Sequence, residues 1–378
     1  MELLTRAHIA ALGLCLLVGC AGPPSPPSVG VATPPPTRAA TAPPPPTAAP
    51  TATATETPSP PPSATPTATA EPAITLAAVG DIMLGRSIGA ALQRDPSGTP
   101  FADIVEQLRA PDITVGNLEC ALGMEGKPAA KGYTFLGPPS GAASLAGAGF
   151  DIVSLANNHS LDFGPRALDE TIQLLDAAGI RHTGAGQDAA AAHQPAMITA
   201  NGLRLAFLAY VNVPIERSGF DTASWEATGD QPGLAWARPR DIAVDVAAAR
   251  ARADLVIVLL HSGVEGQQTP DAAQKAAAHT AIDAGAALVI GAHPHVLQGV
   301  ERYHGGLIAY SLGNIVFDGL WGNGIESAIL RVTLTREGVR DVAWTPVVLR
   351  QGYPRLAEGV RADAIMAQIE RMTARLAH

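Results

Sequence analysis

From residue 74 onward, short apolar runs rich in β-branched residues alternate with stretches of helical spacing. One such stretch, 165–178, begins with proline and stops at a glycine, and alanine-rich amphipathic stretches lie at 240–252 and 272–284. Near-continuous apolar strands between helices are typical of buried parallel sheets, so the chain is predicted to have an α/β fold, with antiparallel strands toward its end. The predicted strands are residues 74–79, 112–115, 151–155, 204–211, 254–260, 287–290, 307–311, 328–335 and 342–349.

Polar residues stand where several of these strands are expected to end. A carboxylate follows each of the first two runs, an Asn-Asn-His turn follows the third, and histidines follow two later runs. Ligands of open α/β sheets bind outside the carboxyl ends of the strands, so we expect these side chains to converge. The set comprises Asp81, Glu119, Asn157, Asn158, His159, Asp162, His261, Glu265, His293, His295, Asn314 and Asp318.

Each of these residues also has an ordinary structural explanation. Asp81 and the two asparagines fit turns, and His261 alone fits a buried structural histidine. His293 and His295 are a stronger signal, because alternate residues of an extended segment point the same way. Together, the carboxylates, one amide and four imidazoles form a mixed oxygen and nitrogen donor set that suits Mn, Fe, Zn or Co better than Ca. The remaining histidines are expected to be surface or structural residues: His8, His182, His193, His279, His304 and His378.

The number of donors predicts two metal ions rather than one. A single ion rarely takes six or seven protein ligands, whereas two ions about 3.5–4 Å apart can share a carboxylate. Such a pair activates water and binds the oxygens of a phosphoryl group. His159 stands beside Asn158 and is placed to protonate a leaving oxygen, to bind substrate, or simply to pack in the turn. Residues 212–239 have no clear period and are predicted to form a long loop near the site.

The first 73 residues have a different character. Arg6 and His8 precede an apolar run that is too short to span a bilayer comfortably, which predicts a signal peptide at 1–20. The run ends in Leu-Val-Gly-Cys, which resembles a bacterial lipobox with lipid attached to Cys20. Residues 21–73 hold 18 of the 33 prolines and few charges, so we expect a disordered Pro/Thr/Ala-rich linker. These features predict an extracytoplasmic protein, lipid-anchored to the bacterial cell membrane.

Composition excludes several classes of protein. The net charge of -9, without a basic cluster, argues against nucleic acid as a partner. Three cysteines, of which Cys120 alone lies beyond residue 20, exclude a disulfide scaffold. No apolar run after residue 20 approaches the length of a spanning helix, which argues against a polytopic membrane protein.

Five motifs resemble, in order, those of the CapA family of poly-γ-glutamate capsule proteins. They are AVGDIMLG at 78–85, GNLE at 116–119, LANNH at 155–159, GAHPHVLQG at 291–299 and YSLGN at 310–314, accompanied by Asp162, Gly164, Phe317 and Asp318. The resemblance implies a metallo-dependent phosphatase-like four-layer α/β/β/α sandwich over 74–355, followed by a C-terminal helix in 356–378. It implies that Glu119 bridges two metal ions and that His159 occupies the position of the catalytic acid. The residues that match the metal ligands are Asp81, Glu119, Asn158, His261, His293 and His295.

The resemblance also implies membership of the calcineurin-like metallophosphoesterase superfamily, and the chain departs from that pattern at two places. Met83 occupies a position that usually holds a histidine ligand, which implies weaker binding of one metal. The segment 261–266 keeps His261 and Glu265 but lacks aromatic neighbours, so no aromatic groove wall is expected there. We expect Glu265 and Asp318 to orient metal-bound histidines through their free ring nitrogens. Asn157, Asp162 and Asn314 are further candidates for supporting the ligands or contacting substrate.

Three functions remain open at the level of sequence. The first is a tethered metal-dependent hydrolase acting on phosphoesters or an anionic envelope polymer such as poly-γ-glutamate. The second is a non-catalytic, polymer-binding part of a poly-γ-glutamate synthesis and export complex with membrane-bound synthase subunits. The third is a surface adhesin on an inactive fold, which failure to bind any divalent metal would favour.

Overall fold

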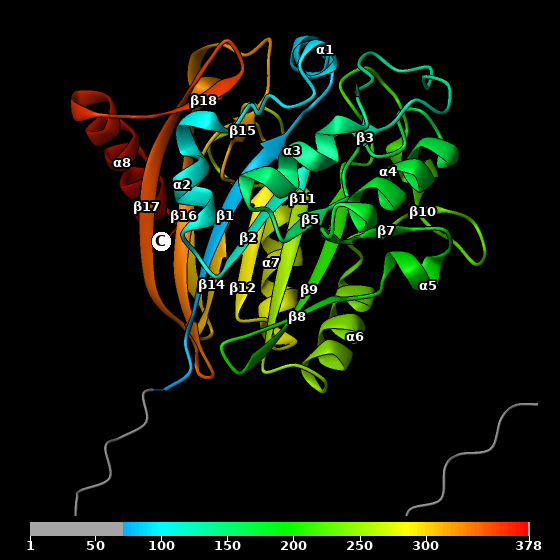
Figure 1. Ribbon diagram of the computed structural model, residues 1–378. Coiled ribbons are helices and arrows are strands. Elements are labelled where there is room, and N and C mark those ends of the chain that lie inside the picture. The colour runs from blue at the N-terminus through cyan, green and yellow to red at the C-terminus, as the bar shows by residue number, and fades with distance from the viewer. Residues whose placement is uncertain (1–70, 377–378) are drawn as a thin grey trace, which may run out of the picture. The chain divides into compact units, whose positions relative to one another are not determined.

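The apolar runs form two β-sheets that face each other, with helices on the outer sides (Figure 1). The computed structural model describes residues 71–376. The expected signal peptide, Cys20 and nearly all of the expected linker lie outside these residues. Within them, no helix is both long enough and apolar enough to cross a membrane.

The first sheet has eight strands in the order β18-β17-β16-β1-β2-β5-β6, with β15 also pairing with β1. Strands β1, β2, β5, β6 and β15 run parallel, whereas β16, β17 and β18 add an antiparallel extension, as expected for the end of the chain. The strands are β1 (Ile74–Ile82), β2 (Ile113–Leu118), β5 (Ile152–Ser154), β6 (Arg181–Thr183), β15 (Asn314–Val316), β16 (Glu326–Thr335), β17 (Gly338–Arg350) and β18 (Tyr353–Leu356).

The second sheet has six strands in the order β13-β14-β12-β11-β9-β8. Its four central strands are parallel, so their carboxyl ends share one edge. The strands are β8 (Ala196–Ala200), β9 (Leu203–Asn212), β11 (Leu255–Ser262), β12 (Leu288–Ala292), β13 (Val300–Tyr303) and β14 (Gly306–Ala309). Two short pairs stand apart, β3 (Ala121–Leu122) with β4 (Leu136–Gly137) and β7 (Ala185–Gly186) with β10 (Gly233–Leu234).

Helices complete the four layers. Alternate residues of β9 divide the core: Leu205 and Phe207 pack with the first sheet, whereas Leu208 and Tyr210 pack under α6 and α7. Helices α2, α3 and α4 cover the first sheet (Figure 1). The helices are α1 (Arg86–Arg94), α2 (Val105–Arg109), α3 (Ser140–Ala148), α4 (Pro165–Ala177), α5 (Ala189–Ala192), α6 (Pro239–Arg250), α7 (Ala272–Asp283) and α8 (Gly359–Ala374), with short 3-10 turns at Ala102–Ile104, Thr222–Trp225 and Gly322–Ile325.

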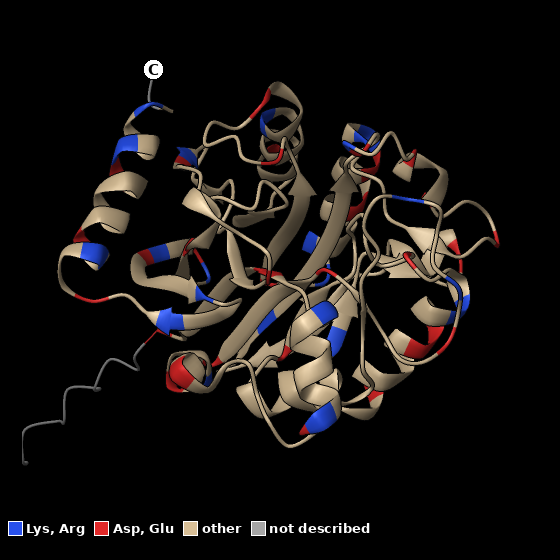
Figure 2. Ribbon diagram, turned by 90° about the horizontal axis from the view of Figure 1, so that it is seen from above, with Lys and Arg blue, Asp and Glu red and all other residues tan. Residues whose placement is uncertain are grey.

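The α/β sandwich expected from the sequence is confirmed. Seen from above, most charged side chains belong to helices and loops, whereas the strands between them are largely uncharged (Figure 2). Helix α8 lies against the antiparallel extension, where Ile365, Ile369 and Met372 pack on Leu297 and Ala328. The parallel strands thus present their carboxyl ends, and the loops that follow them, on a single edge of the molecule.

Candidate metal centre

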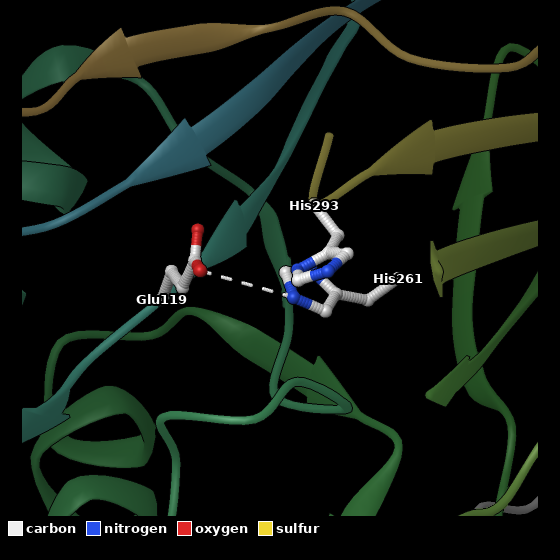
Figure 3. Close-up of side chains that lie close together, drawn as sticks. All are labelled: Glu119, His261 and His293. Atoms are coloured by element: carbon white, nitrogen blue, oxygen red, sulfur yellow. Dashed lines mark ion pairs between the residues drawn. The ribbon is translucent and has the colours of Figure 1, made fainter. Parts of the chain in front are cut away.

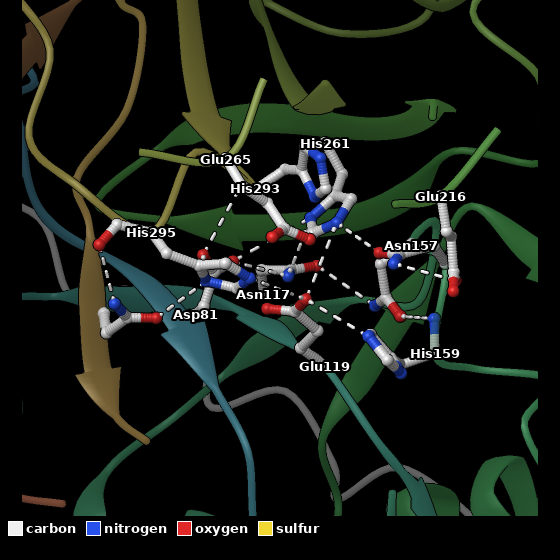
Figure 4. Close-up of polar contacts among 12 residues, drawn as sticks. Asp81, Asn117, Glu119, Asn157, His159, Glu216, His261, Glu265, His293 and His295 are labelled. Carbon is white, nitrogen blue, oxygen red and sulfur yellow. Dashed lines mark hydrogen bonds and ion pairs between the residues drawn. The ribbon is translucent and has the colours of Figure 1, made fainter. Parts of the chain in front are cut away.

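Most of the polar residues predicted at the strand ends lie together in one largely buried cluster (Figure 4). Asp81 lies at the end of β1 and pairs in register with Asn117 of β2, and Glu119 follows β2. From the second sheet, His261 comes from the end of β11, and the segment after β12 supplies His293 and His295. The convergence follows from the parallel direction of the strands, because two sheets present their carboxyl ends to the same space.

Two groups of potential metal ligands share Glu119. One consists of Glu119, His261 and His293 (Figure 3), and the other of Asp81, Glu119 and His295; within each group the donor atoms lie within 4.8 Å of one another. Nε2 of His295 lies 3.6 Å and Nε2 of His261 3.8 Å from Oε1 of Glu119. One carboxylate oxygen therefore stands between imidazoles that reach it from two different strand ends.

Several polar atoms of the cluster have no hydrogen-bond partner among residues 71–376. Within that range, both carboxylate oxygens of Glu119 and Nδ1 of His293 are buried and unpaired. A buried group left without a partner costs roughly 1–3 kcal/mol, and more if it is charged, so such atoms need an explanation. A cation bound by Glu119 and His293 would satisfy them, and the donor chemistry of carboxylate plus imidazole fits a transition metal.

The electrostatics favour the protonation states that metal ligands need for two histidines. Burial lowers the pKa of His261 well below its usual range, and the charges of His293 and His295 contribute to this shift. Burial together with the charge of His295 lowers the pKa of His293 to about 3. Both imidazoles are therefore neutral near pH 7, which is the form that binds metals. Burial also raises the pKa of Glu119 well above its usual range, and the charge of Asp81 raises it further.

Asp81 and His295 form an ion pair with Nδ1 3.2 Å from Oδ2. Burial alone would raise the pKa of Asp81, but the hydrogen bond and charge of His295 outweigh it, so this pKa is lowered. The same interactions raise the pKa of His295 against the opposing effect of burial. Nδ1 of His295 also lies 2.9 Å from Oδ1 of Asn314, whose amide donates to the His295 carbonyl and fixes the ring.

The backbone at the two histidines differs from the sequence-based prediction. An extended segment was expected, yet His293 has φ 95 and His295 has φ 57, both in the left-handed region. Non-glycine residues rarely adopt this conformation, and where they do the strain is often functional. As a result, His293 and His295 enter different ligand groups rather than pointing the same way.

His159 lies beside the ligand cluster as predicted. Its Nε2 lies 3.9 Å from Oε1 of Glu119, and its Nδ1 contacts Oδ2 of Asp162 at 2.7 Å. Burial lowers the pKa of His159, while the charge of Asp162 opposes that shift. The ring of Phe135 stacks on His159 with centroids 4.1 Å apart. The contact with Asp162 fixes the tautomer that turns Nε2 toward the cluster.

Asn158 and Asn157 have different roles. Oδ1 of Asn158 lies 2.8 Å from Nε2 of His261, within the cluster. Asn157 instead donates to the Leu118 carbonyl and to Oδ1 of Asn117, and it accepts from the backbone of His159. Asn158 therefore offers a donor oxygen, whereas Asn157 holds the turn to β2.

One supporting residue is not where the sequence reasoning put it. Asp318 was expected to orient a metal-bound histidine, but its carboxylate accepts from the backbone and side chain of Ser87 and pairs with Arg86. Glu265 turns toward the cluster (Figure 4), where its charge acts on His295 and Glu119, and it also pairs with Arg217 at 3.9 Å, so its orienting role stays a prediction. Both lie on loops, where strand periodicity gives no direction for a side chain. Asn314, rather than Asp318, holds His295.

The two departures noted in the sequence have structural counterparts. Met83 is buried, and its sulfur accepts from the backbone of Gly85, 3.1 Å away. Aromatic walls absent around His261 come from other segments: Phe135 stacks on His159, and the ring centroid of Phe317 lies 4.9 Å from that of His295. The site is thus aromatic on the side of the first sheet.

Comparison with known proteins identifies the family to which this chain belongs. Residues 75–319 match PGA_cap, the family of bacterial capsule synthesis proteins. The chain belongs to the PGA_cap family. Within the family it is 31% identical to "Capsule biosynthesis protein CapA" of Bacillus anthracis over 290 residues, covering 75% of this chain and 69% of that one. It is 30% identical to "PGA biosynthesis protein CapA" of Bacillus subtilis over 284 residues, covering 74% and 73%.

A distant likeness to a solved structure accompanies the PGA_cap match. A phosphatase from Mycoplasma pneumoniae aligns at 10% identity with a TM-score of 0.46, covering 74% of this chain and 94% of that one. A likeness this distant indicates neither a substrate nor a reaction. The PGA_cap assignment is carried by the sequence matches alone.

Three residues of the PGA_cap domain contribute to the site but were missed by sequence reasoning. Nδ2 of Asn117 donates to Oδ1 of Asp81 at 2.8 Å and lies 3.1 Å from Nδ1 of His261. Lys131 and Glu216 form an ion pair next to Asn158. Both lie in loops, whose sequences have no helical or strand periodicity. A signal for Lys131 did exist, since the chain has only three lysines and otherwise uses arginine for its positive charges.

Proposed function

We propose that this PGA_cap protein binds two divalent ions, of Mn, Fe or Zn, at the strand-end cluster. Glu119 bridges them, Asp81 and His295 hold one ion, and His261 and His293 hold the other. Asn158 supplies a further oxygen. The observation that carries the proposal is the pair of ligand groups sharing Glu119, a carboxylate whose two buried oxygens have no hydrogen-bond partner.

We further propose that the site hydrolyses a bond in an anionic envelope polymer or phosphoester. A metal pair polarises the scissile group and lowers the pKa of water. His159 contacts Asp162 through Nδ1 and stands next to Glu119. Its Nε2, which carries no proton in this tautomer, would take a proton from the attacking water and pass it to the leaving oxygen of a phosphoester or the leaving nitrogen of an amide-linked polymer. Asn314 and Asn117 keep His295 and Asp81 in place.

The cellular role follows from the family and from the N-terminal sequence. The relatives are named for capsule and PGA biosynthesis, and we propose that this chain acts in synthesis, export or processing of such a polymer, in contact with membrane-bound synthase subunits. The lipobox supports anchoring through Cys20. A Cys20→Ala variant should leave the membrane fraction, and a variant that stays there would contradict the anchor.

The test of the hydrolase proposal compares wild type with a Glu119→Ala/His295→Ala double variant. Hydrolysis of bis-p-nitrophenyl phosphate and of poly-γ-glutamate is followed with added Mn²⁺. We expect turnover of at least one substrate to fall about 100-fold or more in the double variant, as loss of metal support predicts. Unchanged turnover would refute a metal-dependent reaction at this site. Polymer binding without turnover would instead favour a non-catalytic component of a synthase complex.

A further inference from the structure

A fully buried lysine lies directly behind the proposed metal centre. Lys131 belongs to the irregular segment between β3 and β4, and its side chain has 0% exposure. Lysine is almost never fully buried unless it is paired. Its environment is therefore built to hold a positive charge.

The Lys131 ammonium has three close oxygen partners, two through hydrogen bonds and one through an ion pair. Nζ lies 2.8 Å from Oδ1 of Asp162, 2.5 Å from Oε1 of Glu216 and 2.6 Å from the carbonyl oxygen of Asn158. The side chain of Asp162 is also fully buried, and that of Glu216 is only 9% exposed. One buried cation thus joins two carboxylates that come from segments far apart in the sequence.

Each of these carboxylates also contacts a residue of the proposed metal centre. Asp162 contacts Nδ1 of His159 through Oδ2 at 2.7 Å. Glu216 accepts from Nδ2 of Asn158 at 3.1 Å. The second contact sets the orientation of the Asn158 amide, because Nδ2 bound to Glu216 leaves Oδ1 turned toward His261.

Lys131 also holds the loop between β9 and β10 against the site. Its Nζ lies 5.5 Å from the ring centroid of Phe220 and 5.0 Å from that of Trp225, both in this loop. A cation over aromatic rings is attracted to their faces, and more strongly where water is excluded. Glu216 comes from the same loop, so Lys131 contacts it through both charge and aromatic surface.

We propose that Lys131 is a positioning residue of the metal centre. Its charge keeps Asp162 and Glu216 close together behind the site, and these orient His159 and the oxygen of Asn158. Without the cation, the two carboxylates would face each other in a buried space and move apart. The inference rests on the proposed metal binding and adds a residue that contacts no ion itself.

The test measures Mn²⁺ affinity by isothermal titration calorimetry in the purified protein. Lys131→Met removes the charge, and Lys127→Met, at an exposed position four residues earlier, is the matched control. We expect Lys131→Met to bind at least one Mn²⁺ about 10–100-fold more weakly than wild type, the range typical of residues that support ligands. Lys127→Met should bind like wild type.

A second measurement and a milder variant distinguish the positioning role of Lys131 from a purely structural role. Thermal unfolding in EDTA reports the stability of each protein, and affinity is compared only among proteins that are folded at the titration temperature. Glu216→Gln keeps the shape of the side chain and leaves Lys131 paired with Asp162, so it serves if Lys131→Met does not fold. We expect weaker Mn²⁺ binding in Glu216→Gln too, because the amide of Asn158 is held less firmly.

The outcomes are distinguishable. Wild-type affinity in folded Lys131→Met, or in Glu216→Gln where only that variant folds, overturns the positioning role while leaving the metal centre intact. Absence of Mn²⁺ binding in wild type overturns the proposed function and this inference with it. Weakened binding in the Lys131 and Glu216 variants but not in Lys127→Met supports both.

Discussion

At the scale of single residues, Glu119 carries an internal conflict. It is fully buried, its carboxylate has no hydrogen-bond donor in the part of the chain that the structure describes, and Asp81 lies nearby. Function and stability make opposite demands on such a group, since the charge that binds cations is costly to bury. The cost should appear in metal-free protein and disappear when metal binds.

Glu119→Gln should therefore stabilise the metal-free protein. With EDTA at pH 7, we expect its free energy of unfolding to exceed that of wild type by about 1–3 kcal/mol, because the variant buries no charge. With saturating Mn²⁺ the order should reverse, since wild type gains more from the ligand. Urea unfolding under both conditions measures the effect, and a variant less stable than wild type in EDTA would contradict the account.

The same residue predicts a dependence of stability on pH. The pKa of Glu119 in the folded state lies above its unfolded value because of burial and the charge of Asp81. The folded protein then holds a proton that the unfolded chain has lost, so this group makes metal-free protein less stable as pH rises above the unfolded pKa of about 4.3. In EDTA, the wild-type curve should fall more steeply with pH than that of Glu119→Gln. Parallel curves would show that Glu119 is not strained by burial.

The sequence predicted the candidate site residues and, in Asn314 and Asp162, two of their supports, but not Lys131 or Glu216. Asp81, Glu119, His261, His293 and His295 were found because each follows an apolar strand, and strand ends meet at one edge. Lys131 and Glu216 escaped because they lie in loops, where no period links sequence position to side-chain direction. The same reason explains why Asp318 was given the wrong partner.

At the scale of elements, helix α7 supports the segment that carries His293 and His295. Asp271 accepts from the backbone of Gln274, and Gln274 accepts from the backbone of Asp271, which forms a capping box. The amide of Gln274 then donates to Gln298, whose own amide donates to the Gln267 carbonyl. The start of the helix is thereby tied to the loop that follows β12.

Asp271→Ala should destabilise the protein by about 1 kcal/mol, the usual cost of losing an N-cap. Gln274→Ala should cost more, since Gln274 is buried at 1% exposure and its loss leaves Oε1 of Gln298 without its donor. Chemical denaturation of both variants provides the comparison. An equal or smaller cost for Gln274→Ala would show that the link to Gln298 contributes nothing.

Helices α5 and α6 meet β9 through a second buried polar contact. Nδ1 of His193, at the end of α5, lies 2.7 Å from Oδ2 of Asp245 in α6, and this carboxylate also accepts from the Tyr210 hydroxyl. The hydrogen bond to Asp245 raises the pKa of His193 despite partial burial. Charged His193 thus stabilises the junction of three elements far from the proposed metal site.

This contact should make stability depend on pH in a predictable direction. Because its folded-state pKa is raised, the contribution of His193 is complete below its unfolded pKa of about 6.5 and is lost as pH rises through the folded value. His193→Gln should cost about 1 kcal/mol at pH 5.5 and less at pH 9. The free energy of unfolding of wild type and His193→Gln, measured at both pH values, tests this prediction. A cost that does not change with pH would contradict a charged His193.

At the scale of the whole molecule, the length and periodicity of each element determined whether the sequence could predict it. Nine apolar runs predicted the long strands and three stretches predicted α4, α6 and α7, because buried parallel strands and amphipathic helices have strong periods. The short elements β3, β4, β7 and β10 have two residues each, too few for a period to show. Helix α3, rich in alanine and glycine, has little contrast between its faces.

The arrangement of the two sheets also explains why so many ionisable groups lie together at one edge of the fold. Both sheets direct their parallel strands to it, and the apolar layers behind the cluster exclude water from the imidazoles of His261 and His293. The candidate ligands therefore lie on the strand ends of the two sheets or in the segments that directly follow them, and buried partners such as Asn117 and Asn314 hold their side chains in place.

The central claim is that two metal ions share Glu119, and metal content tests it most directly. Mass spectrometry would measure Mn, Fe and Zn in the purified protein, in Glu119→Ala and in Glu125→Ala, whose side chain is half exposed and pairs with Arg166. The account predicts about two equivalents in wild type and Glu125→Ala, as in binuclear sites, and less than one in Glu119→Ala. Metal-free wild type, or two equivalents retained in Glu119→Ala, would contradict it.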